Sequence, residues 1–81
     1  MRCMLLHPTD GDWRKYPSLR RARDAFWADA DEALNRWGQS EERWSEAWVI
    51  FGHFDTPSGA EYPDRILHYD ATRDRVRVER T

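Results

Sequence analysis

The chain has 81 residues, with 13 Lys and Arg against 15 Asp and Glu, a formal charge of -2 and one cysteine. A chain of this length is expected to form one small domain over residues 1–81 with a thin core. The near-balanced charge argues against a DNA mimic and against nucleic-acid binding through bulk charge, and the lone Cys3 excludes an internal disulfide framework. The apolar runs are far shorter than the roughly 18 residues of a membrane span, so we expect a soluble cytoplasmic protein without membrane contact.

The first element is a short strand over residues 1–7, predicted because Cys3 to Leu6 form an unbroken apolar run typical of a strand buried on both faces. A turn is predicted over residues 7–12, which contain Pro8 and the pair Asp10-Gly11.

The strongest pattern predicts a helix from residue 17 or 18 to about residue 37. Apolar residues recur there at spacings of three and four and form a single stripe: Leu19, Ala22, Phe26, Ala30, Ala33 and Trp37. Ser18 is suited to the N-cap and Gly38 to a left-handed C-terminal position. One further helical turn is predicted over residues 40–44.

Three strands are predicted after the helix, over residues 47–54, 65–70 and 75–80. A loop over residues 55–63 joins the first two, and a turn over 71–74 joins the last two. The order is therefore strand, helix, strand, strand, strand. We expect an α+β fold in which one long helix packs on one face of a four-stranded mixed sheet, with residues 1–7 parallel to residues 47–54.

Strand alternation divides the side chains of the last three strands between two sheet faces. The set expected to face the helix is Ala47, Val49, Phe51, Leu67, Tyr69, Val76 and Val78. The set expected on the other face is Trp48, Ile50, Phe54, Ile66, His68, Arg75 and Arg77, with Trp44 just before the strand. Pairing across residues 55–63 is expected to place His53 opposite Arg65 and His68 opposite Ile50.

The second face suggests the leading hypothesis, because a single helix covers only one face of a sheet and leaves an aromatic-rich patch on the other. We expect a non-enzymatic protein-interaction module without a cofactor. Its narrower form is a small inhibitor or accessory factor of a mobile element. The expected binding residues are Trp44, Trp48, Ile50, Phe54, Ile66, Arg75 and Arg77. The cover is either a partner protein, a second copy of the chain in a homodimer, a second helical turn or the 55–63 loop.

The alternative is a single-stranded nucleic-acid-binding protein, in which the tryptophans stack on bases and an arginine cluster holds phosphates. The expected anion-binding residues lie around the start of the helix: Arg14, Lys15, Arg20 and Arg21. The competing interpretation is that Asp10, Asp12 and Asp24 neutralise these cations on a solvated surface.

The least favoured hypothesis is a metal-dependent enzyme. If the first strand runs parallel to residues 47–54, five side chains gather at one sheet edge: His7, Asp10, Asp12, His53 and Asp55. Their spacing matches no known ligand motif, and we expect them to be surface and turn residues.

Overall fold

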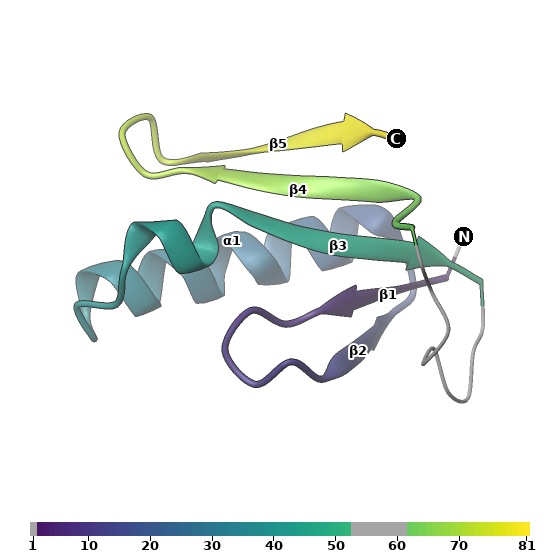
Figure 1. Ribbon diagram of the computed structural model, residues 1–81, viewed down its shortest axis with the longest axis horizontal. Coiled ribbons are helices and arrows are strands. Elements are labelled where there is room, and N and C mark those ends of the chain that lie inside the picture. The colour runs from purple at the N-terminus through teal and green to yellow at the C-terminus, as the bar shows by residue number, and fades with distance from the viewer. Residues whose placement is uncertain (1, 53–61) are drawn as a thin grey trace.

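The computed structural model describes residues 2–52 and 62–81. A single α-helix, α1 (Leu19–Asn35), lies across one face of a five-stranded sheet, as Figure 1 shows. The strands are β1 (Cys3–Leu6), β2 (Trp13–Tyr16), β3 (Glu46–Phe51), β4 (Arg65–Asp70) and β5 (Arg75–Arg80), and a 3-10 turn, η1 (Glu41–Trp44), precedes β3. The sheet order is β2-β1-β3-β4-β5, and every neighbouring pair is antiparallel.

The prediction of a four-stranded mixed sheet was wrong, because it omitted β2. This strand forms a hairpin with β1 and pairs Leu6 with Trp13 and Cys3 with Tyr16. The hairpin reverses the chain before α1 begins, so the helix starts at the end of the sheet where β1 begins and not where β1 ends. β3 consequently runs antiparallel to β1, with Cys3 opposite Phe51.

The prediction of α1 is confirmed in its body and its caps. Ser18 Oγ accepts a hydrogen bond from the backbone N–H of Arg21, as expected of an N-cap. At the other end, Gly38 has a φ of 62°, and the N–H of Gln39 donates to the carbonyl of Ala33 at 2.9 Å. The helix therefore ends at Asn35, and Trp37 is 64% exposed instead of completing the apolar stripe.

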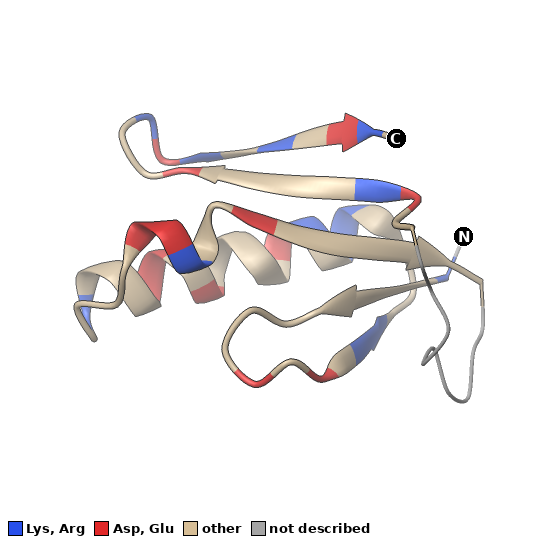
Figure 2. Ribbon diagram, in the orientation of Figure 1, with Lys and Arg blue, Asp and Glu red and all other residues tan. Residues whose placement is uncertain are grey.

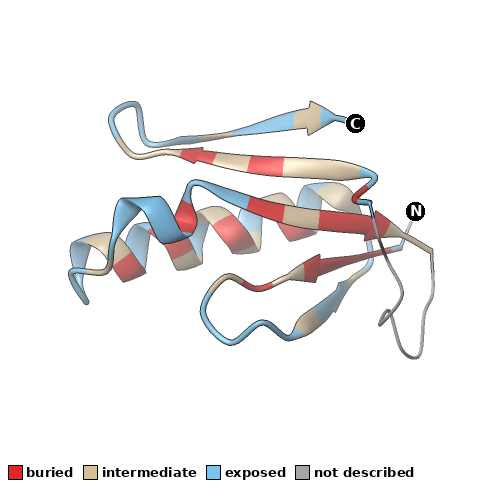
Figure 3. Ribbon diagram, viewed as in Figure 1, coloured by how far each residue is buried: buried red, intermediate tan, exposed pale blue. Residues whose placement is uncertain are grey.

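The core lies between α1 and the sheet, and the predicted division of the strand residues is confirmed for this face. Ala47, Val49, Leu67 and Tyr69 are buried with Phe26 and its neighbours on α1. In Figure 3 the buried residues of the sheet lie mainly in β1, β3 and β4, whereas β5 is largely exposed.

The register between β3 and β4 differs from the expected one. His68 lies opposite Glu46, and Arg65 lies opposite Val49. The shift is an even number of residues, so the side chains of β3, β4 and β5 keep their predicted faces although their neighbours on the paired strand change.

Candidate interaction surface

The side of the sheet opposite α1, called here the open face, carries alternate residues from all five strands. No helix of the described residues covers it (Figure 1). The pairings between strands assign it the following residues: Met4, Leu6, Trp13, Lys15, Glu46, Trp48, Ile50, Ile66, His68, Asp70, Arg75, Arg77 and Glu79.

An apolar band crosses the middle of the open face. Leu6 pairs with Trp13, and Trp48 pairs with Ile66, and all four side chains are half-buried. Beside this band Met4 lies opposite Ile50, and both are buried. Two half-exposed tryptophans on one sheet face present large apolar area together with an indole N–H, a combination common at protein interfaces.

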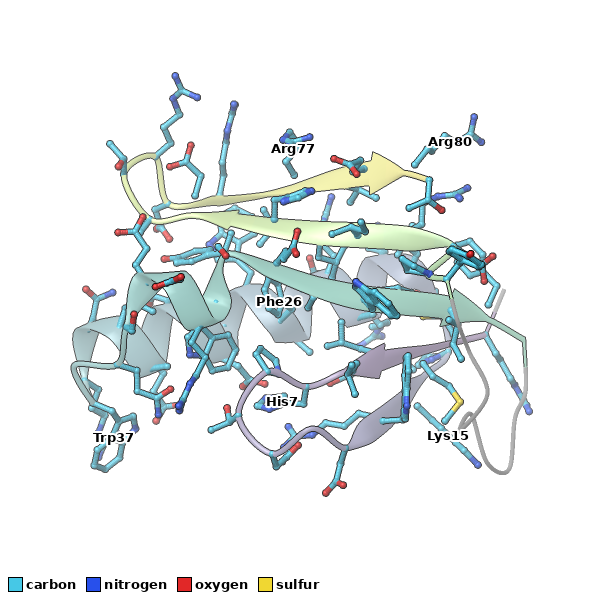
Figure 4. All side chains as sticks on the ribbon, in the orientation of Figure 1. His7, Lys15, Phe26, Trp37, Arg77 and Arg80 are labelled. Carbon is cyan, nitrogen blue, oxygen red and sulfur yellow. The ribbon has the colours of Figure 1, made fainter. Side chains whose placement is uncertain are left out.

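Charged residues lie along the β4–β5 side of the band. His68 Nε2 is 3.2 Å from Glu79 Oε1, and Arg77 reaches the same carboxylate at 3.9 Å. Figure 4 shows Arg77 beside this strand pair and Lys15 at the other side of the sheet. The open face is thus an apolar centre with charges of both signs around it, which is the composition of a protein-binding patch with a polar rim.

A hollow of about 330 Å³ adjoins the band, between the β1–β2 turn and the start of β3. Leu6, Trp48 and Pro8 give it apolar walls, and Glu46 contributes a carboxylate. Its size and lining suit one apolar side chain that a partner inserts.

Of the residues predicted to bind a partner, five lie on the open face: Trp48, Ile50, Ile66, Arg75 and Arg77. Phe54 lies outside the described residues. Trp44 is placed elsewhere, because η1 turns its ring into the core, where it is 2% exposed and 5.8 Å from the ring of Phe26. Its indole N–H donates to Gln39 Oε1 at 2.9 Å, so the polar atom is satisfied inside the fold.

Sequence reasoning missed the contribution of β1 and β2 to this surface. Trp13 and Lys15 share one face of β2, while Arg14 and Tyr16 share the other. That alternation, after a turn containing Asp-Gly, is the signal that predicts the second strand of a hairpin.

The predicted anion-binding cluster is divided among three places. Arg14 faces the helix side, where it bonds to Asp10 at 2.9 Å and lies 3.8 Å from Asp29. Lys15 points to the open face, opposite Met4. Only Arg20 and Arg21 stay together, in an open hollow at the start of α1 that also contains Asp24. Figure 2 shows basic residues at this end of the helix and acidic residues towards its other end.

His7 is 6% exposed and joins the β1–β2 turn to α1. The backbone N–H of Thr9 donates to His7 Nδ1, so the proton is assigned to Nε2, which donates to Asp29 Oδ2 at 3.3 Å. Asp10 lies on the same turn, 3.8 Å from His7 Nδ1. A hydrogen bond from the Asp12 N–H, and then one from the Arg14 guanidinium, hold the pKa of the Asp10 carboxyl below its usual value. Both nitrogens of His7 are engaged, so this ring fastens the hairpin to the helix and has no free lone pair for a base or metal ligand.

The geometry on which the enzyme hypothesis depended was wrong. Since β1 is antiparallel to β3 and Cys3 lies opposite Phe51, His7 follows the end of β1 that lies away from Phe51. His53 and Asp55 lie outside the described residues. Within residues 2–52 and 62–81, no three His, Cys, Asp or Glu side chains are grouped as a metal site.

Cys3 is buried in the core under α1, and burial raises the pKa of its thiol, which disfavours the reactive thiolate. None of the helices in the described part of the chain has the length and apolar character needed to cross a membrane. Comparison with protein-family models, curated proteins and solved structures found no match to this chain.

Proposed function

We propose that this protein is a non-enzymatic interaction module that binds a second protein through the open face of its sheet. The observation that carries the proposal is the apolar band, in which Trp13, Leu6, Trp48 and Ile66 lie half-buried on a face that no described helix covers. Burying the remaining apolar area of these side chains gives association its driving force.

The hollow beside Trp48 indicates how such a partner would be anchored. Interfaces concentrate their binding energy in a few aromatic anchors and the pockets next to them. The partner would present an apolar side chain to this hollow and polar groups to the charges of Glu46 and Arg77 around the band. The narrower hypothesis of a mobile-element inhibitor or accessory factor stays a prediction, since no described residue bears on it.

Protein is favoured over single-stranded nucleic acid because of the charges. The predicted phosphate-binding cluster is split, and Arg14 is engaged by two carboxylates. On the open face each arginine has an acidic neighbour, since Arg75 lies opposite Asp70 and Arg77 is 3.9 Å from Glu79. Two of the four residues of the apolar band, Leu6 and Ile66, are aliphatic, whereas base stacking needs aromatic platforms.

The test compares Trp48→Ser with Trp37→Ser as immobilised baits. Trp37 is the more exposed ring and lies at the far end of α1 (Figure 4), so it is a matched control for losing a tryptophan. We expect the wild-type and Trp37→Ser baits to capture a partner protein that the Trp48→Ser bait does not capture. That protein, once purified, should bind wild type in calorimetry with a negative heat-capacity change.

Equal binding by all three baits would refute the use of this face. If a single-stranded oligonucleotide quenches the tryptophan fluorescence of wild type at 50 mM salt, and Trp48→Ser abolishes this binding, the nucleic-acid alternative would replace the proposal. A wild-type dimer that Trp48→Ser converts to a monomer would instead show that the open face binds a second copy of the chain.

A further inference from the structure

β5 lies at one edge of the sheet, and its outer backbone groups have no neighbouring strand among the described residues. It has six residues without proline or glycine, whereas the other edge strand, β2, has four and is followed by Pro17. Val78 is 37% exposed on it, although it lies on the helix side of the sheet. A regular, uncovered edge of this length is a template for pairing with another strand.

We propose that two copies of this chain pair antiparallel through β5, about a two-fold axis that is perpendicular to the sheet and passes midway between the Val78 residues of the two copies. Rotation about such an axis leaves each sheet face on its own side, so residues that come to lie opposite share a face. A second copy of the chain is the partner that fits this edge, because the side chains of β5 are complementary to those of an antiparallel β5.

This register places Val78 opposite Val78 of the second copy and Arg77 opposite Glu79 of the second copy, twice by symmetry. Opposite charges directly across an antiparallel pair are stabilising. The side chains of Arg77 and Glu79 are 59% and 43% exposed, so both are accessible for this contact. On the helix side, Arg80 lies opposite Val76, where its aliphatic stem covers the valine.

The neighbouring register, centred on Arg77, is disfavoured because it sets two guanidinium groups directly opposite each other. The proposed register gives one continuous sheet with twice the five strands of a single copy. Both helices lie on one side of it, and both open faces lie side by side on the other. The pairing uses no residue of the apolar band, so its failure and the failure of the proposed function are distinguishable.

Sedimentation equilibrium of wild type, Arg77→Glu, Glu79→Arg and an equal mixture of the two variants tests the register. Each variant alone converts two attractive pairs into two repulsive ones, and we expect its dimer to be at least about tenfold weaker than that of wild type. In the mixture, each pair joins a carboxylate of the Arg77→Glu chain to a guanidinium of the Glu79→Arg chain, so association returns.

Arg75→Glu is the matched control, because position 75 lies opposite Thr81 in this register and its replacement should change the dimer little. Thermal melting of each variant separates lost pairing from lost folding. A wild type that stays monomeric up to about 100 μM overturns the dimer. A mixture no more associated than its components, or an Arg75→Glu dimer weakened more than that of Arg77→Glu, overturns the register.

Discussion

Asp74 is the residue through which the β4–β5 turn is fastened to the helix, and its replacement tests the packing of α1 on the sheet. One oxygen, Oδ1, accepts from Trp27 Nε1 at 3.0 Å and from Tyr69 Oη at 3.2 Å. The backbone at Asp74 is left-handed, with a φ of 48°. The side-chain hydrogen bonds and the left-handed backbone of Asp74 therefore both affect stability, and different substitutions separate the two contributions.

Asp74→Gly removes the acceptor but tolerates the positive φ. The hydroxyl of Tyr69, a residue 6% exposed, then lacks its partner, which costs about 1–3 kcal/mol, while the half-buried indole of Trp27 can bond to water. We expect a loss of about 2 kcal/mol. Asp74→Ala should lose about 1 kcal/mol more, because a Cβ is strained in the left-handed region. Asp74→Asn keeps a side-chain oxygen and tolerates this backbone, so it should lose the least.

Urea unfolding followed by tryptophan fluorescence measures these differences. With a slope of about 1 kcal/mol per molar urea, the midpoint of Asp74→Gly should fall by about 2 M. A double-mutant cycle with Tyr69→Phe should give a coupling of about 0.5–1.5 kcal/mol, since the two changes remove the same hydrogen bond. An Asp74→Ala protein as stable as Asp74→Gly would refute the left-handed backbone, and a zero coupling would refute the Tyr69 bond.

Three further outcomes are expected. Burial, and then the hydrogen bond to Asp74, raises the pKa of Tyr69 from 10.0 to about 12, so the folded state holds this proton more tightly than the unfolded chain. The stability that the protonated Tyr69 hydroxyl contributes is complete below pH 10 and is lost as the pH rises from 10 to 12. The difference in unfolding free energy between wild type and Tyr69→Phe, measured by denaturation at each pH, should therefore shrink over that range. A constant difference would contradict the raised pKa. Gly38→Ala should cost about 1 kcal/mol in thermal melting from backbone strain alone, because an added Cβ meets no atom within 4 Å, and a neutral result would place the helix end elsewhere. Phe26→Ala should cost about 3–5 kcal/mol in the same assay, because the ring is fully buried against Trp44, and an unchanged melting temperature would put Phe26 outside the core.

Local chemistry was enough to predict α1 and its ends to within a few residues. The spacing of apolar residues, the hydroxyl of Ser18 and the freedom of Gly38 act within one or two turns, so neighbouring residues contain the information. The exception is Trp37, whose spacing suits the apolar stripe. The helix ends before it, and spacing no longer determines the direction of its side chain.

The alternating pattern of β3, β4 and β5 likewise determined which of their side chains share a face. An error in register by an even number of residues leaves that division unchanged, which is why it is correct although His68 lies opposite Glu46 instead of Ile50. The residues that this alternation assigned to the open face, such as Trp48 and Ile66, are where the candidate interaction surface lies.

Tertiary structure alone decided the strand directions, the full extent of the open face and the place of Trp44. β2 is a four-residue strand that exists through its pairing with β1, and its presence reverses the direction of β1 relative to β3. This reversal brings Trp13 and Leu6 into the apolar band and separates Arg14 from Lys15. The 3-10 turn η1 similarly directs Trp44 beneath the sheet, towards Phe26. In each case the physical reason is a contact between residues distant in the chain, whose partner no local pattern specifies.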